Sequence, residues 1–300
     1  MFRTLTMYVC LSFFSAMAQV QAKELFVSTT GNDAVAYADN SLSHPWATPN
    51  KAWAEARSGD TVYFRGGTFH CATPVNTSST GNHGTADHPI RFTSYPGEHA
   101  VLEWLDCTAP EPFVAALSIY KDYNEIDNLE IRSSFTGTTY LGGSTIYSFA
   151  AHTRITRCTI RLLQVVRPDN SAPIVFYASS HFGEVSNCRV IGFDTLRSSG
   201  VHMFRTKGIR VQNNEISNCV HAIYLKHSNT LEDRPEWTNY FENNYIHVCV
   251  DGIHGVPNRT IIRNNLLVGC DLSFGGDGGL GDGYVGGDYN TLANNTIYNG

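Results

Sequence analysis

The stretch AIYLKHSN (222–229) places a tyrosine and a lysine two residues apart. Ile223 and Leu225 alternate with Tyr224 and Lys226, which is the spacing of a β-strand that has one apolar face. Tyr224 and Lys226 then point outward, where Lys226 is either a solvated charge or a base that meets a substrate. Which of the two it is depends on the elements that lie beside this strand.

A short motif, apolar–x–Asn–(Asn/Cys)–x–apolar, recurs along the chain. Its copies, two of them loose, begin at residues 126, 155, 185, 211, 241, 262 and 292. Self-similarity at this period, with β-branched and aromatic residues between Gly and Asn corners, predicts a solenoid of strands. We expect an all-β parallel β-helix, because stacked turns bury an apolar face that one turn cannot bury.

Small side chains should form columns along such a solenoid. Stacked Asn side chains can hydrogen-bond to one another and to the turn backbone. Cysteines fall in columns too, and no CxxC spacing occurs, so we expect buried free thiols rather than disulfides or a metal–thiolate site. Those in columns are Cys158 and Cys188 at the second Asn position, and Cys219, Cys249 and Cys270 six residues after the first Asn.

Residues 1–22 have the pattern of a secretory signal peptide. Arg3 precedes an apolar run, Met7–Met17, and a small-residue site follows at VQA. The run is too short to span a membrane, so we expect a protein exported to the periplasm or the outside. Residues 23–300 would form one β-helix domain. The last residues, NNTIYNG, stop within a repeat, and we expect the solenoid to continue beyond them.

The charge distribution bears on the partner. The net charge of −6 argues against nucleic acid. Residues 151–210 nevertheless hold nine Lys and Arg against three acidic residues. This basic belt favours a polyanionic ligand, although a solvated face would have the same composition. We expect a monomer without a membrane span that binds an acidic polysaccharide.

Two N-terminal segments carry a family resemblance. HPWATPNKAWAEARSGDTVYFRGGTFH (44–70) and HPIRFTSYPGEHAVLEW (88–104) resemble the start of secreted right-handed β-helix proteins of the pectate-lyase-like superfamily. The resemblance implies a short capping helix that starts at Thr48, buries Trp53 and leads to a strand at Thr61–Phe64. It implies a right-handed β-helix over nearly the whole chain. It implies no single activity, because the superfamily holds lyases, hydrolases, epimerases and non-enzymes.

Aligning the repeats on the Asn motif places five strands between residues 145 and 256 side by side. Their outward side chains form two columns with about 4.8 Å between strands. A solvated face should be polar, and aromatic, His and Lys side chains here instead predict a substrate groove, unless a loop covers them. The columns are Tyr147, Val175, His202, Tyr224 and His254, and Phe149, Tyr177, Phe204, Lys226 and Val256.

These side chains suit β-elimination on a uronate polysaccharide. That reaction needs a group that neutralises the carboxylate, a base for the C5 proton and an acid for the leaving oxygen. Lys226 is the candidate base, if burial or nearby arginines favour its neutral form. The candidate acids are Tyr224, His202 and His254, and the candidate carboxylate partners are Arg205 and His227.

The loop 227–239 follows Lys226 directly and adds further candidates. Its acidic residues Glu232, Asp233 and Glu236 are candidate ligands for Ca²⁺, and we expect no other cofactor. Aromatic rings offer flat faces to sugars. The candidate substrate-binding residues are Tyr147, Tyr177, Phe204, His227 and Trp237.

Other functions remain open. A uronate epimerase would use the same proton abstraction. A glycoside hydrolase needs two carboxylates on the cleft, and the stripe has none, although Asp251, level with His221, begins one strand. A non-catalytic glycan-binding or adhesion module would use the aromatics alone. Serine-nucleophile and phosphate-loop motifs do not occur in the sequence. A secreted polysaccharide lyase is therefore the first hypothesis.

Overall fold

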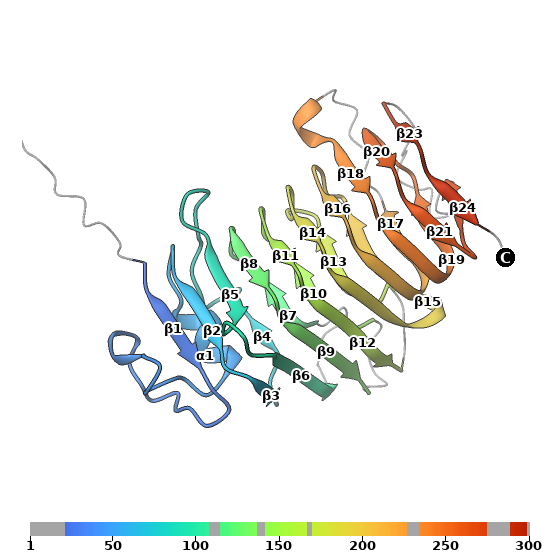
Figure 1. The fold of residues 1–300 in the computed structure, drawn as a ribbon. Helices are drawn as coiled ribbons and strands as arrows, with labels where there is room; N and C mark the ends of the chain where they lie inside the picture. Colours follow the sequence, from blue (N-terminus) through green and yellow to red (C-terminus); the bar gives the residue numbers. More distant parts are fainter. Residues whose placement is uncertain are drawn as a thin grey trace, which may run out of the picture.

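The chain winds into a parallel β-helix, as the repeats predict (Figure 1). The helix α1 and the strand β1 lie at one end, and β23 and β24 at the other. The computed structural model describes residues 22–107, 115–136, 142–166, 170–226, 234–274 and 289–298, without the side chains of 194–197.

Within these residues, every turn contributes a strand to a first sheet. All of its strands pair in parallel with their neighbours. In spatial order they are β1 (Glu24–Val27), β2 (Thr61–Phe64), β5 (Ile90–Ser94), β8 (Asn124–Asp127), β11 (Arg154–Thr156), β14 (Glu184–Ser186), β16 (Arg210–Gln212), β18 (Asn239–Glu242), β20 (Thr260–Arg263) and β23 (Thr291–Ala293).

A second sheet follows after a sharp turn. Its strands are β3 (Gly67–His70), β6 (Ala100–Cys107), β9 (Glu130–Phe135), β12 (Thr159–Val165), β15 (Arg189–Phe204), β17 (Glu215–Lys226), β19 (Tyr245–Gly255), β21 (Leu266–Val268) and β24 (Thr296–Tyr298). Three of these strands are long, and their C-terminal halves pair with a further row. We call this row the third face; its other strands are β4 (Val75–Asn76), β7 (Ala115–Ile119), β10 (Ser144–Ser148), β13 (Ala172–Tyr177) and β22 (Asp271–Phe274).

Inward side chains of the third face stack in register, which confirms the predicted alternation. The column consists of fully buried residues that are partners on successive strands. Burying one such aliphatic side chain contributes roughly 1.5–3 kcal/mol, so each member of the column adds to the stability of the fold. Its members are Ile146, Ile174, Val201, Ile223 and Ile253.

The capping helix is present where the sequence predicts it. Helix α1 spans Pro49–Glu55, and the Thr48 hydroxyl accepts a hydrogen bond from the Lys51 N–H at 3.2 Å. Trp53 is 2% exposed, and its ring stacks on Phe92 with 4.0 Å between centroids. This helix therefore fills the N-terminal end of the core. Two short 3₁₀ helices, η1 (Tyr37–Asp39) and η2 (Pro235–Trp237), lie in connections.

The turn between the first and second sheets holds the predicted Asn column. In each later repeat the first Asn has a positive φ, and the second Asn is turned inward. The side-chain amide of Asn214 donates to Asn244 at 3.0 Å, Asn244 to Asn265 at 2.9 Å, and Asn265 to Asn295 at 2.9 Å. In earlier turns the same column contains Cys188, Cys158 and Leu129.

The cysteines agree with the prediction. Those within the described residues, Cys71 onward, are all free, and all but Cys71 are buried. No helix in the described part of the chain is long and apolar enough to cross a membrane.

We expect Asn244→Ala to lower the free energy of unfolding by about 3 kcal/mol. The Asn244 amide donates to the Val211 carbonyl and to Asn265, and its oxygen accepts from Asn214, so the substitution leaves buried partners unsatisfied. Urea unfolding followed by circular dichroism measures the change. The control is Asn243→Gly: residue 243 is exposed with φ 58°, which glycine adopts freely, so we expect less than about 0.5 kcal/mol. Equal effects of the two variants would contradict a stabilising ladder.

Candidate active site

The outward side of the third face brings three of the predicted residues together. His202, Tyr224 and His254 are register partners on β15, β17 and β19. The rings of His202 and Tyr224 stack with 4.8 Å between centroids, and Tyr224 lies 5.3 Å from His254. This arrangement gathers groups that can donate and accept protons on one rigid surface.

His221 and Asp251 complete this cluster, and the sequence assigned neither of them a role. Nδ1 of His221 lies 2.9 Å from Oδ2 of Asp251, and Nδ1 of His254 lies 3.3 Å from the same oxygen. The two imidazole rings stack at 4.0 Å. Strict alternation puts His221 on the inward side with Ile223. However, Ala222 is buried as well, so the alternation breaks where β17 passes onto the third face.

Lys226 lies at the end of the same strand and is half-buried. Its Nζ donates to the side-chain oxygen of Asn170 at 3.2 Å and lies 6.0 Å from the centroid of the Tyr224 ring. Phe204 is its register partner on β15, and the Arg205 guanidinium lies 5.1 Å over the Phe204 ring. The Lys226 amine, the Tyr224 phenol and the Arg205 guanidinium therefore lie in the same region of the third face.

A run of stacked aromatic rings leads away from Lys226. Phe204 stacks on Tyr177 at 4.8 Å, Tyr177 lies 5.8 Å from Tyr147, and Tyr147 stacks on Phe149 at 4.6 Å. Tyr147 is only 6% exposed, and burial raises its pKa well above that of free tyrosine. Tyr177 and Phe204 are half-buried and are the better placed of the predicted sugar-binding rings.

The first outward column is therefore mostly core, which is the alternative that the sequence left open. Tyr147 and Val175 pack with Ala115 and Ala172 into a small second cluster. His202 and Tyr224 are buried too, and the second column remains half-buried. A groove over this second column stays a prediction.

Other predicted residues lie elsewhere or outside the described residues. Trp237 is in η2, where the Lys207 ammonium lies 3.5 Å over its ring and its carbonyl accepts from Gly208. Glu236 lines a hollow of about 380 Å³ beside the first sheet, with Tyr123 and Tyr240 among its walls. His227, Glu232 and Asp233 lie outside the described residues. Their roles, and the Ca²⁺ site, remain predictions.

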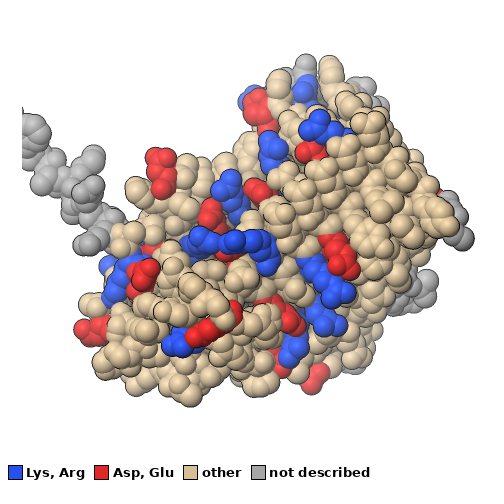
Figure 2. All heavy atoms as spheres, viewed as in Figure 1, with Lys and Arg blue, Asp and Glu red and all other residues tan. Residues whose placement is uncertain are grey.

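Three arginines of the basic belt, Arg154, Arg157 and Arg189, form ion pairs with carboxylates. Arg154 pairs with Glu125 at 3.1 Å, and Arg189 with Glu215 at 3.4 Å. Figure 2 shows Lys and Arg intermixed with Asp and Glu over the first and second sheets. This face is therefore a surface of paired charges rather than a cationic patch.

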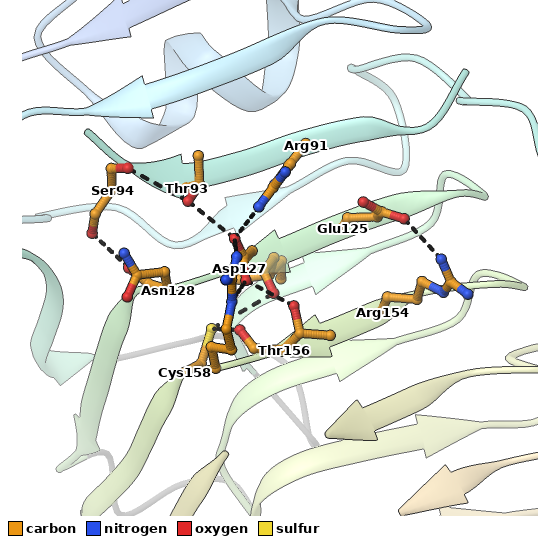
Figure 3. A network of polar contacts seen from close by, with 11 residues as sticks. Arg91, Thr93, Ser94, Glu125, Asp127, Asn128, Arg154, Thr156 and Cys158 are labelled. Carbon is orange, nitrogen blue, oxygen red and sulfur yellow. Dashed lines mark hydrogen bonds and ion pairs between the residues drawn. The ribbon is translucent and has the colours of Figure 1, made fainter. Parts of the chain in front are cut away.

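Asp127 on β8 is the most heavily bonded carboxylate on this face, at 3% side-chain exposure (Figure 3). One oxygen accepts from Thr156 at 2.9 Å and from Arg157 at 2.8 Å. The other accepts from Arg157 at 2.6 Å, from Thr93 at 3.3 Å and from Arg91. Burial by itself would raise the pKa of Asp127, but these hydrogen bonds lower it to about 2. A carboxylate so fully occupied holds strands together and does not exchange protons near neutral pH.

Comparison with known families decides the classification. A model described as a right-handed β-helix region matches residues 115–299, and one described as a Pel9A-like right-handed β-helix region matches residues 25–162. The chain is a right-handed β-helix protein of the pectate-lyase-like superfamily. The resemblance of residues 44–104 is thereby confirmed. The Pel9A-like match of this β-helix protein ends before the cluster at residues 202–254.

Individual relatives are distant. Pectate lyase PEL9 of Emericella nidulans is 30% identical over 91 residues, which are 30% of this chain and 21% of the relative. The match thus spans about a fifth of that enzyme. A structure titled as the complex of XylC with xylose superposes with a TM-score of 0.52 at 11% identity, over 84% of this chain and 70% of the other. Pectate lyase Pel9A gives 0.49 at 12% identity, over 94% and 79%. Likeness at this level shows the fold alone.

We expect Asp127→Asn to lower the free energy of unfolding by about 1–3 kcal/mol at pH 7, because two arginines lose their shared carboxylate. An aspartate with a depressed folded pKa contributes stability above its unfolded pKa of about 3.9, and this contribution is lost as pH falls toward 2. The gap between wild type and variant should therefore shrink between pH 4 and pH 2 in denaturant titrations. Glu125→Gln on the same strand breaks only an exposed pair and should cost less than about 1 kcal/mol. A gap that stays constant down to pH 2 would contradict this account.

Proposed function

We propose that this protein is a secreted lyase that cleaves an acidic, uronate-containing polysaccharide by β-elimination. The observation that carries the proposal is the position of Lys226 beside Tyr224 and Arg205, at the end of an aromatic run. The superfamily membership and the PEL9 relative, which is named as a pectate lyase, support a polysaccharide substrate. The N-terminal sequence supports secretion.

Each group has one task in the proposed reaction. The Arg205 guanidinium binds the uronate carboxylate through paired hydrogen bonds, which makes the C5 proton more acidic. The neutral amine of Lys226 takes that proton. The C4–O bond then breaks as the C4–C5 double bond forms, and the Tyr224 hydroxyl gives its proton to the leaving oxygen. The side-chain oxygen of Asn170 accepts a hydrogen bond from Lys226 Nζ and so fixes the position of the base.

The aromatic run has the task of binding. The half-buried rings of Tyr177 and Phe204 lie on neighbouring strands and can make apolar contacts with successive sugar rings. An epimerase would use the same base and then return the proton to C5, and a binding module would need the rings but no base. A requirement for Lys226 distinguishes a lyase from a binding module, and formation of an unsaturated product distinguishes a lyase from an epimerase.

We expect Lys226→Ala to reduce turnover at least 100-fold, because general-base catalysis contributes that much or more. The assay follows absorbance near 235 nm, where unsaturated uronates absorb, with pectate, alginate and glycosaminoglycans as substrates. Lys51→Ala is the matched control, since Lys51 lies on α1 in an ion pair with Glu55, and we expect wild-type turnover. No unsaturated product from any polymer, or equal turnover in Lys226→Ala, would overturn the lyase.

The same assay tests the proposed Ca²⁺ site at Glu232, Asp233 and Glu236. We expect chelation to reduce turnover and added Ca²⁺ to restore it, because a hard cation bound by carboxylates would help to hold the uronate carboxylate. Turnover that survives chelation, or that returns after chelation without added Ca²⁺, would remove calcium from the proposal.

We expect Phe204→Ala to raise KM about tenfold with a smaller effect on kcat, because one stacking contact is worth roughly 0.5–1.5 kcal/mol and acts on bound substrate and transition state alike. Steady-state kinetics on the best polymer measures both constants. The exposed Tyr298 on β24, away from the third face, provides the control variant Tyr298→Ala. A loss confined to kcat in Phe204→Ala would argue against a binding role.

A further inference from the structure

We propose that His221, Asp251 and His254 form a binding site for a divalent transition-metal cation of the Zn²⁺ class. The three side chains come from β17 and β19, on the outward side of the third face. Each offers one ligand atom, and these three atoms lie within 4.8 Å of one another.

The spacing suits a small cation. Two edges of the triangle are 2.9 Å, from His221 Nδ1 to Asp251 Oδ2, and 3.3 Å, from His254 Nδ1 to the same oxygen. A tetrahedral Zn²⁺ with bonds of 2.0–2.1 Å keeps its ligand atoms roughly 3.3 Å apart. The two imidazole rings stack 14° from parallel, so seating the ion requires them to turn until both nitrogens face it, with no change in the strands.

The donor set selects the kind of metal. Two imidazole nitrogens and one carboxylate oxygen suit borderline cations such as Zn²⁺, Co²⁺ and Ni²⁺. Ca²⁺ prefers six to eight oxygen ligands, and only one of these three side chains, that of Asp251, supplies oxygen. This site is therefore distinct in chemistry and in residues from the proposed Ca²⁺ site in the loop 227–239.

The surroundings hold the ligands in place and leave an approach open. His221 and Asp251 are register partners on paired strands, so the backbone fixes their separation. The Tyr224 ring lies 4.9 Å from His221 and 5.3 Å from His254 and packs against both rings. All three ligand side chains keep about a fifth of their surface exposed, 20%, 20% and 21%, but Nδ1 of His221 is itself buried, so this ring must turn for an ion and a fourth ligand from solvent to reach it.

Metal binding does not require the protein to be a lyase. Only one consequence rests on the proposed function: the open position of the cation would lie beside Tyr224 and could take the uronate carboxylate in place of water. The two proposals are separated by measuring binding without any polysaccharide.

The test titrates untagged, chelator-treated protein with ZnCl₂ by calorimetry and repeats the titration with CaCl₂. We expect one Zn²⁺ per chain with a Kd in the micromolar range or below, a raised Tm, and no comparable heat from Ca²⁺. His221→Ala and Asp251→Asn should each weaken Zn²⁺ binding at least tenfold. His247→Ala is the matched control, because His247 lies on β19 with Asp251 and His254 but contacts Glu215 at 3.2 Å, outside the three-ligand cluster. This variant should bind Zn²⁺ as the wild type does.

Visible absorption of bound Co²⁺ provides a second measurement in case a variant folds poorly. Co²⁺ bound by imidazole gives visible absorption, which we expect in wild type and in His247→Ala and not in the conservative His254→Gln. Wild-type Zn²⁺ affinity in both His221→Ala and Asp251→Asn, or an equal loss in His247→Ala, would overturn the site and leave a hydrogen-bonded triad. Zn²⁺ binding without any lyase activity would overturn the proposed function and leave the site standing.

Discussion

The structure depends on one constraint: each turn must stack on the next in parallel register, so that equivalent side chains become neighbours about 4.8 Å apart. Because of this stacking, a column of mostly isoleucine side chains forms part of the core, and a column of asparagines forms a hydrogen-bonded ladder. Stacking also gathers the outward His202, Tyr224 and His254 from segments far apart in the sequence. Core and candidate site are thus two results of the same register.

Much of the fold could be predicted from the sequence because the repeat determines the register of the strands. From residue 126 onward the Asn motif marks one corner of each turn, and counting from it places Ile223 inward and Tyr224 outward. The capping helix was predictable from Thr48 and Trp53, whose capping and packing roles are local. The cluster around Asp251 was harder to predict, because His221 stands at a bend where alternation fails. The sequence shows the strand but not the place where the strand bends.

Composition also proved a weak guide to surface charge. The excess of arginines in residues 151–210 predicted a belt for polyanions, yet Arg154 and Arg189 find carboxylates on neighbouring turns. A count of charged residues along the sequence does not detect ion-pair partners that lie on the neighbouring turn. Specific positions such as Lys226, whose neighbours follow from register, carry more information about function than the net charge of a segment.

The column that changes from Leu129 through Cys158 and Cys188 to the asparagines is held by different forces along its length. Apolar side chains and thiols fill it in the earlier turns, and hydrogen bonds between amides connect it in the later ones. Hydrophobic attraction weakens on cooling, whereas urea also competes for polar contacts. Cooling would therefore weaken this column more in its earlier turns than in its later ones.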